Sequence, residues 1–216
     1  MALAKPDNGA TMVLFLKAFV IGLSIAAPVG PIGVLCIRRT LVFGRGVGFA
    51  SGLGAATADA FYGAVAAFGL TFVQRFFVQN ARPLHLIGGG VLLLIGLRTM
   101  LAKRDAVVIP GDGAPRVAGL LPAYASTLLL TITNPMTIIS FAAVFAVIAP
   151  AGGLDSGSAA VTVAGVFSGS AAWWLVLSAG VGAVRRAAGA TLLGWVGRLS
   201  GGVIAGFGAA QLLERT

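Results

Sequence analysis

The longest uncharged stretch of the chain runs from 117 to 154 and contains no Asp, Glu, Lys or Arg. A helix needs about 20 apolar residues to cross the hydrocarbon core of a bilayer, so this stretch exceeds one crossing. Only 10% of all residues are charged, whereas an ordinary soluble domain carries roughly 25%. So few charges cannot cover a water-facing surface, which predicts an all-α protein with the lipid bilayer as its main partner.

About six apolar runs are long enough to be membrane-spanning helices. We expect spans at 18–37, 46–74, 83–102, within 120–148, at 156–184, and at 199–213 extended back toward Trp195. The connection 103–116 is the only sizeable hydrophilic one and reads as a flexible loop. The first run exceeds the roughly 7–15 apolar residues of a signal peptide, which favours a retained helix. Met12 is an alternative start to Met1, because residues 1–11 are polar and typical of disorder.

The net charge of +9 comes from basic residues in short clusters between the apolar runs. They are not massed on one segment, which argues against a nucleic-acid partner. Cytoplasmic loops of membrane proteins are enriched in Lys and Arg. One side of the predicted helices collects ten basic residues: Arg38, Arg39, Arg45, Arg98, Lys103, Arg104, Arg116, Arg185, Arg186 and Arg198. The other side collects five: Lys5, Lys17, Arg75, Arg82 and Arg215. This bias predicts a multi-pass protein of the cytoplasmic membrane with both termini outside.

The third and sixth predicted spans resemble each other at a fixed offset. Residues 87–96 align with 199–208, 112 positions later, and share three glycines and a valine. Gly52 and Gly165 align the second and fifth spans at nearly the same offset, and the first and fourth spans each contain a proline break. We therefore expect one domain, 1–216, built from two inverted three-helix repeats at about 12–102 and 117–213. Transporters with this plan bind their solute between the repeats, near the middle of the bilayer.

Two proline elements are predicted to interrupt helices. Pro28, Gly30 and Pro31 lie inside the first span, and Asn134 and Pro135 lie inside the fourth. Proline removes a backbone donor and cannot continue a regular helix, and freed backbone groups in a membrane must be buried in protein or line a cavity. The two breaks indicate discontinuous helices whose backbone groups bind a solute. The alternative is a simple kink at each position.

Asp59 is the only acidic residue within a predicted span. An ionised carboxylate there costs roughly 2.5–3.5 kcal/mol on insertion scales, so such residues usually face a cavity and serve function. Its helix face also carries Tyr62 and the small residues Gly52, Ala55, Ala56 and Gly63. Asp59 is predicted to bind an ammonium group, relay a proton, or do both in alternation. The structural alternative is an ion pair, for example with Arg98.

These residues together resemble the LysE/RhtB family of amino-acid exporters. The likeness covers most of the chain and is densest at 28–32, 36–41, 44–45 and 52–63, and it continues in the glycine-rich third and sixth spans. It implies six helices and efflux of amino acids or close relatives, driven by a proton or ion gradient without ATP hydrolysis. The spacing Pro28-Val-Gly-Pro31 departs from the Pro-Gly-Pro of many members, which leaves the identity of the substrate open.

Other functions are weighed on the same residues. A metal-cation exporter or an exporter of another solute is the main alternative, although hard cations require several oxygen ligands and one embedded acid supplies few. Neither a zinc motif nor a Gly-x-Ser-x-Gly element is found, so no enzyme, metal or cofactor is predicted. A non-transporting membrane assembly protein would gain nothing from an embedded acid. The remaining residues have simpler interpretations. We expect Arg38 and Arg39 to set topology or to neutralise a substrate carboxylate, and Trp173 and Trp174 to pack in the interior. The glycines of the third and sixth spans could form contacts within the chain or the interface of a homo-oligomer.

Overall fold

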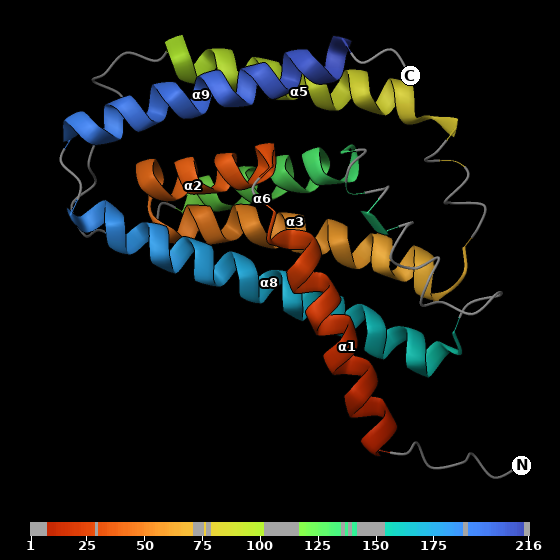
Figure 1. Ribbon diagram of the computed structural model, residues 1–216. Coiled ribbons are helices and arrows are strands. Elements are labelled where there is room, and N and C mark those ends of the chain that lie inside the picture. The colour runs from red at the N-terminus through yellow and green to blue at the C-terminus, as the bar shows by residue number, and fades with distance from the viewer. Residues whose placement is uncertain are drawn as a thin grey trace, which may run out of the picture.

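The computed structural model describes residues 8–28, 30–70, 76, 79–101, 117–134, 137, 140–141, 154–187 and 190–213. Within this part of the chain every regular element is a helix, as the composition predicts (Figure 1). The predicted loop at 103–116 and Pro135 lie outside the described residues. The helices are α1 (Asn8–Ala26), α2 (Pro31–Phe43), α3 (Arg45–Ala67), α5 (Ala81–Leu101), α6 (Val117–Ile132), α8 (Ser156–Ala187) and α9 (Ala190–Leu213).

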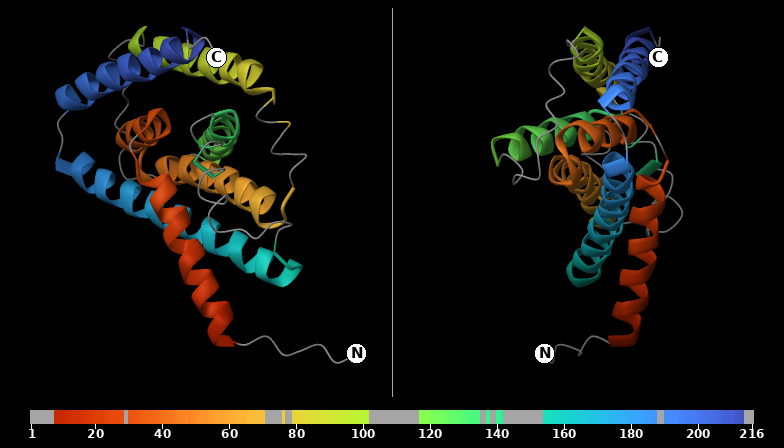
Figure 2. Two further views of the ribbon diagram at one scale, coloured as in Figure 1. Left: turned by 45° about the vertical axis from the view of Figure 1, so that its right-hand side comes forward. Right: turned by 90° about the vertical axis from the view of Figure 1, so that its left-hand side faces the viewer.

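Helix α3 forms the centre of the fold. It contacts α2, α6 and α8, while α1 packs along α8. Helices α5 and α9 pack side by side as a separate outer pair in all three ribbon views (Figures 1 and 2). A buried cluster of Leu35, Leu92, Leu130 and Ile204 joins this pair to α2 and α6. The face of α3 that carries Asp59 is therefore covered by neighbouring helices.

The first predicted span, 18–37, is not one helix. Helix α1 begins at Asn8 and ends at Ala26, and α2 starts afresh at Pro31. Because the helix already includes residues 8–11, the prediction of disorder throughout 1–11 is wrong for these four residues. The second span is shorter than expected, because α3 ends at Ala67.

A glycine explains where α3 stops. Gly69 takes a left-handed backbone with φ 63°. The amide of Gly69 donates to the carbonyl of Ala66 (3.1 Å), and that of Leu70 donates to Val65 (2.9 Å). This pair of bonds is the Schellman motif, in which glycine ends a helix and satisfies its last carbonyls.

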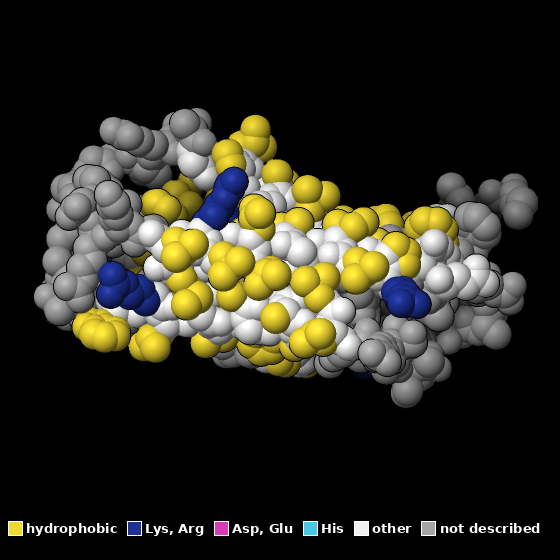
Figure 3. All heavy atoms as spheres, turned by 90° about the horizontal axis from the view of Figure 1, so that it is seen from above, with side chains coloured by type: hydrophobic (Ala, Val, Ile, Leu, Met, Phe, Trp, Pro, Cys, Tyr) yellow, Lys and Arg dark blue, Asp and Glu magenta, His cyan; other side chains and the backbone are white. Residues whose placement is uncertain are grey.

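Among the described residues, three helices are long and apolar enough to cross a membrane: Asn8–Ala26, Arg82–Leu101 and Ser156–Arg185. The apolar helix Gly119–Ile132 is shorter. The outer face of α5 and α9 is apolar as well: in Figure 3 hydrophobic side chains cover it, and Lys and Arg lie toward its ends. Exposed side chains on these two helices include Leu86, Ile87, Leu94, Leu97, Leu199, Val203 and Phe207. A lipid environment suits this surface, whereas the number of six spans stays a prediction.

Glycines let the helices of the outer pair approach closely, and they do so reciprocally. A methyl group on Gly96 would lie 2.7 Å from the Cα of Ala205, and one on Gly208 would lie 2.9 Å from the Cα of Leu93. Gly208 follows Gly96 by 112 positions, and Ala205 follows Leu93 by the same number. Such mutual contacts are typical of two copies related by a twofold axis.

The inner helices show the same reciprocity. Gly165 of α8 fits against the backbone of α1, where a methyl group would lie 2.7 Å from the carbonyl oxygen of Phe15. Gly54 of α3 fits likewise against α6, where a methyl group would lie 3.0 Å from the amide nitrogen of Leu128. These contacts match Gly165 with Gly54, two positions from the Gly52 of the sequence alignment. The pairing of Gly52 with Gly165 expected from the sequence is therefore shifted by two positions, and the inverted repeat itself stays a prediction.

Candidate functional site

Asp59 lies in the interior of the helix bundle, where α3 crosses α8. Its side chain is 4% exposed. The hydroxyl of Ser170, which is fully buried on α8, donates to Asp59 Oδ2 at 2.7 Å. No Lys or Arg among the described residues forms an ion pair with this carboxylate, and Arg98 is exposed in the last turn of α5. The carboxylate therefore has one neutral partner and no counter-charge from the described chain.

The first proline element separates α1 from α2. Pro28 is exposed at the turn, and its carbonyl accepts a hydrogen bond from the amide of Gly30 at 3.0 Å. Gly30 is the N-cap of α2, and Pro31 stands in the first turn of that helix. Among the described residues other than its chain neighbours, no atom lies within 4 Å of the position that a side-chain Cβ on Gly30 would take. The first amides of α2, which have no partner within the helix, thus begin beside an open position.

This break packs one helical turn from Asp59. Ala26 before the break and Ile32 after it belong to one buried cluster with Ala55 and Ala56 of α3. Trp174 of α8 completes the cluster, together with Cys36. Ala55 precedes Asp59 by four positions, the spacing that puts two residues on the same face of a helix.

The second break follows α6 and lies on the other side of Asp59. The amide of Asn134 donates to the carbonyl of Thr131 (3.2 Å), and the carbonyl of Asn134 accepts from the amide of Thr137 (3.1 Å). Tyr62, on the turn after Asp59, donates its hydroxyl to the carbonyl of Ile132. The ring of Tyr62 also packs on Phe141, with ring centroids 5.9 Å apart. Tyr62 thus holds the end of α6 against α3.

The structure therefore brings together most of the residues that the sequence singled out. Asp59 lies between the two breaks along α3, with the first break packed on Ala55 and Ala56 and the second held by Tyr62. Pro28 is turned outward, so the first break contributes through Gly30 and the start of α2. In the part of the chain that the structure describes, no three His, Cys, Asp or Glu side chains come together as a metal site would require.

A second polar centre lies around Arg39, to which the sequence gave no internal partner. Its guanidinium donates to Ser51 Oγ on α3 at 2.9 Å and to three acceptors on α6. Those acceptors are the carbonyl of Ala123 (2.9 Å), Thr127 Oγ1 (2.8 Å) and Ser126 Oγ (2.8 Å). Arg39 thus joins α2, α3 and α6, so it does more than set topology.

Ser170 was also missed, because the internal alignment leads only near it. Asp59 and Ser170 are 111 positions apart, whereas the third and sixth spans are related by an offset of 112. Continuing that offset from Asp59 leads to Ala171, one position after Ser170. No comparable signal marks Ser51, Ser126 or Thr127, because Ser and Thr are common in membrane helices as packing and hydrogen-bonding residues.

The fold and the site together define a class: an all-α, multi-pass membrane protein with a buried acid between two interrupted helices. The family model of the LysE type translocator matches residues 23–215. The chain belongs to this family. The expected family resemblance is confirmed.

One relative with a curated name is similar over part of the chain. A protein of Bacillus subtilis (strain 168) named "Putative amino acid efflux protein YcgF" is 32% identical over 136 residues, which cover 62% of this chain and 63% of that protein. The match therefore spans less than two thirds of the length of this relative. No solved structure matches the chain.

Proposed function

We propose that the protein is a secondary active exporter of amino acids or related small metabolites across the cytoplasmic membrane, driven by a proton or ion gradient. Membership of the translocator family supports export. The name of the Bacillus relative, an amino acid efflux protein, supports the substrate class. The observation that carries the proposal is the carboxyl group of Asp59. This group is buried, accepts a hydrogen bond from Ser170, and forms no ion pair among the described residues.

A carboxylate in a low-dielectric interior is costly unless it is neutralised. Two species can neutralise Asp59 during transport: a proton, or the ammonium group of an amino acid. Because both use the same carboxyl group, binding of one favours release of the other. Alternating occupancy of this kind would exchange an outgoing amino acid for an incoming proton, which is the coupling that a secondary exporter needs.

The two breaks are proposed to supply the mobile parts of this cycle. Amides at the start of α2 carry the partial positive charge of a helix N-terminus, which favours a carboxylate. The first break consists of Pro28, Gly30 and Pro31. The second break consists of Asn134 and Pro135, and Tyr62 of α3 is proposed to act with it. The reciprocal contacts across α5–α9 and across α1–α8 and α3–α6 support two inverted repeats, with Asp59 and Ser170 at their junction.

The orientation is proposed from the basic residues. The side chain of Arg185 approaches Gly44, with Nη1 3.4 Å from the position of an added methyl group. Arg45 and Arg185 therefore meet at one end of α3 and α8. At the other end, the amide of Leu154 donates to the carbonyl of Ala67 at 2.7 Å. The end that carries Arg45 and Arg185 is proposed to face the cytoplasm, with both termini outside.

Transport by the purified protein tests the proposal. Liposomes that contain the protein are loaded with each of the 20 standard amino acids in turn, in radiolabelled form. The loss of radiolabelled amino acid from the liposomes is followed under an imposed pH gradient. We expect gradient-dependent, saturable transport of at least one amino acid. Asp59→Asn should lower its rate about a hundredfold or more, because losing a buried charge pair costs ~2–5 kcal/mol.

Asp155→Asn is the matched control. This carboxylate is exposed and accepts hydrogen bonds from the amides of Gly157 (3.0 Å) and Ser158 (3.2 Å) at the start of α8. Asparagine also caps helices well, so this variant should transport like the wild type. If no amino acid moves, the proposed substrate class is wrong. If both variants transport equally well, the role given to Asp59 is wrong.

A further inference from the structure

We infer that the indole N–H of Trp174 binds the carboxylate of the transported amino acid while Asp59 holds its ammonium group. This inference rests on the proposed function and adds a second anchor to the same site. It assigns to Trp174 a part in substrate recognition rather than packing alone.

The indole nitrogen of Trp174 is a buried donor without a partner. Trp174 is 4% exposed, and its Nε1 atom has no hydrogen-bond acceptor among the described residues. An unsatisfied buried donor costs about 1–3 kcal/mol, so native proteins rarely keep one without a reason. Indole can only donate, and an acceptor supplied by a ligand would remove this cost.

The position of Trp174 relative to Asp59 suits an α-amino acid. Trp174 lies one turn after Ser170 on α8, about 6 Å along the helix axis, and Ser170 contacts Asp59 directly. The ammonium and carboxylate groups of an α-amino acid are attached to the same carbon. With one hydrogen bond of about 2.8 Å at each end, such a molecule reaches from the acid to the next turn of α8.

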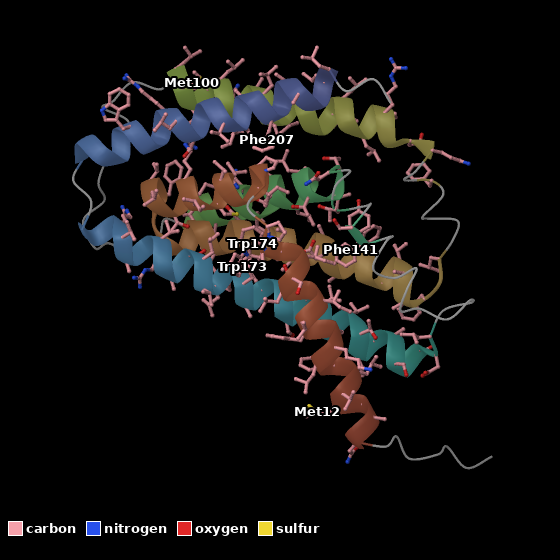
Figure 4. All side chains as sticks on the ribbon, in the orientation of Figure 1. Met12, Met100, Phe141, Trp173, Trp174 and Phe207 are labelled. Atoms are coloured by element: carbon pink, nitrogen blue, oxygen red, sulfur yellow. The ribbon has the colours of Figure 1, made fainter. Side chains whose placement is uncertain are left out.

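The surroundings of Trp174 favour a negative group over a second cation. Trp174 (Figure 4) shares its buried cluster with Ile32, which stands in the first turn of α2 beyond the break. The N-terminus of a helix offers free amides and a positive partial charge. The indole donor of Trp174 and the first turn of α2 thus belong to one buried cluster.

Another unpartnered donor on the same helix marks the limit of the inferred site. The hydroxyl of Ser178 is also buried without a partner. It lies two turns beyond Ser170, about 12 Å along the axis, which is too far for an α-amino acid held by Asp59. Ser178→Ala therefore serves as a control for the removal of a buried donor.

Substituting Trp174→Phe keeps an aromatic ring and removes only the N–H. The probe is the amino acid that the wild type transports fastest among the 20 standard ones, and the comparison ligand is the amine formed by removing its carboxylate. We expect Trp174→Phe to raise the KM for the amino acid about tenfold or more, as losing a hydrogen bond to a charged group implies. The amine is measured as an inhibitor of amino-acid transport. The concentration of amine that halves transport should change less than twofold, because the amine has no carboxylate that the indole N–H could bind.

Trp173→Phe is the control for ring size, since Trp173 is the adjacent, partly buried tryptophan packed on the same cluster. This variant and Ser178→Ala should leave both values unchanged. A second readout does not depend on transport: the amino acid, and not the amine, should shift the ¹⁵N-indole signal that Trp174→Phe removes. An unmoved signal, or equal losses for amino acid and amine, overturns the inference while leaving the exporter proposal intact. Absence of transport for every amino acid overturns both.

Discussion

Arg39 forms hydrogen bonds inside the helix bundle that its position in the sequence did not predict. Its guanidinium bridges Ser51 on α3 and three oxygen atoms on α6. A planar group with five donors suits several acceptors at once, whereas the ammonium of lysine is a compact charge on a flexible stem. Arg39 therefore stabilises the contact between the two halves of the chain through hydrogen bonds more than through its charge.

Arg39→Lys should destabilise the protein although the charge is kept. We expect a loss of about 1–3 kcal/mol, because the ammonium of lysine has three donors for four acceptors, so at least one of these acceptors loses its partner. This corresponds to a fall of several degrees in the Tm measured by fluorescence in detergent. Arg98→Lys is the control, since Arg98 is exposed in the last turn of α5. Equal Tm values for the two variants would show that the network around Arg39 adds nothing to stability.

Single residues were predictable from the sequence where charge made them unusual. Asp59 stood out because an acid in an apolar run is costly. Its partner Ser170 and the acceptors of Arg39 are hydroxyls, which are common in membrane helices and carry no such mark. Which hydroxyl meets which charge depends on how α3 crosses α6 and α8, and that geometry is a property of the packed fold.

At the scale of elements, glycine positions decide how closely helices approach. Gly208 of α9 lies against α5, where an added methyl group would come within 2.7 Å of the carbonyl oxygen of Gly89. Gly206, two positions earlier on the same helix, has no atom within 4 Å of that position. The two glycines therefore form a matched pair with opposite expected responses.

Gly208→Ala should destabilise the α5–α9 pair, because the helices would have to move apart. Overpacking of this kind typically costs about 1–3 kcal/mol. Gly206→Ala should be neutral or slightly stabilising, since alanine favours a helix by up to about 1 kcal/mol over glycine. Thermal unfolding of the two variants side by side checks this. If Gly206→Ala lost as much stability as Gly208→Ala, the close approach at Gly208 would not be the cause.

The first break was predictable from the sequence, whereas the bounds of the helix before it were not. Two prolines within four residues predicted an interruption at 28–31, and α1 ends at Ala26. The sequence placed the first span at 18–37, however, because an apolar run shows where lipid can be and does not show where a helix begins. Helix α1 starts ten residues earlier than that, at Asn8.

At the scale of the whole molecule, the charge bias predicts a direction of insertion. Arg45 and Asp155 are exposed and lie at opposite ends of the α3–α8 pair. In a Cys36→Ala background, a cysteine at position 155 should react with a membrane-impermeant maleimide in intact cells. A cysteine at position 45 should react only after the membrane is permeabilised. The reverse labelling pattern would contradict the proposed orientation.

The proposed transport cycle requires that the carboxyl group of Asp59 becomes accessible and is covered by the bound amino acid. A hydrophobic carbodiimide tests this directly, because it reacts with carboxyl groups inside membranes. Mass spectrometry of the modified peptide gives the rate at Asp59, with and without a saturating concentration of the transported amino acid. We expect Asp59 to react with the carbodiimide, and we expect the amino acid to slow this reaction severalfold. An Asp59 that never reacts, or that reacts equally fast with the amino acid present, would contradict the proposed cycle.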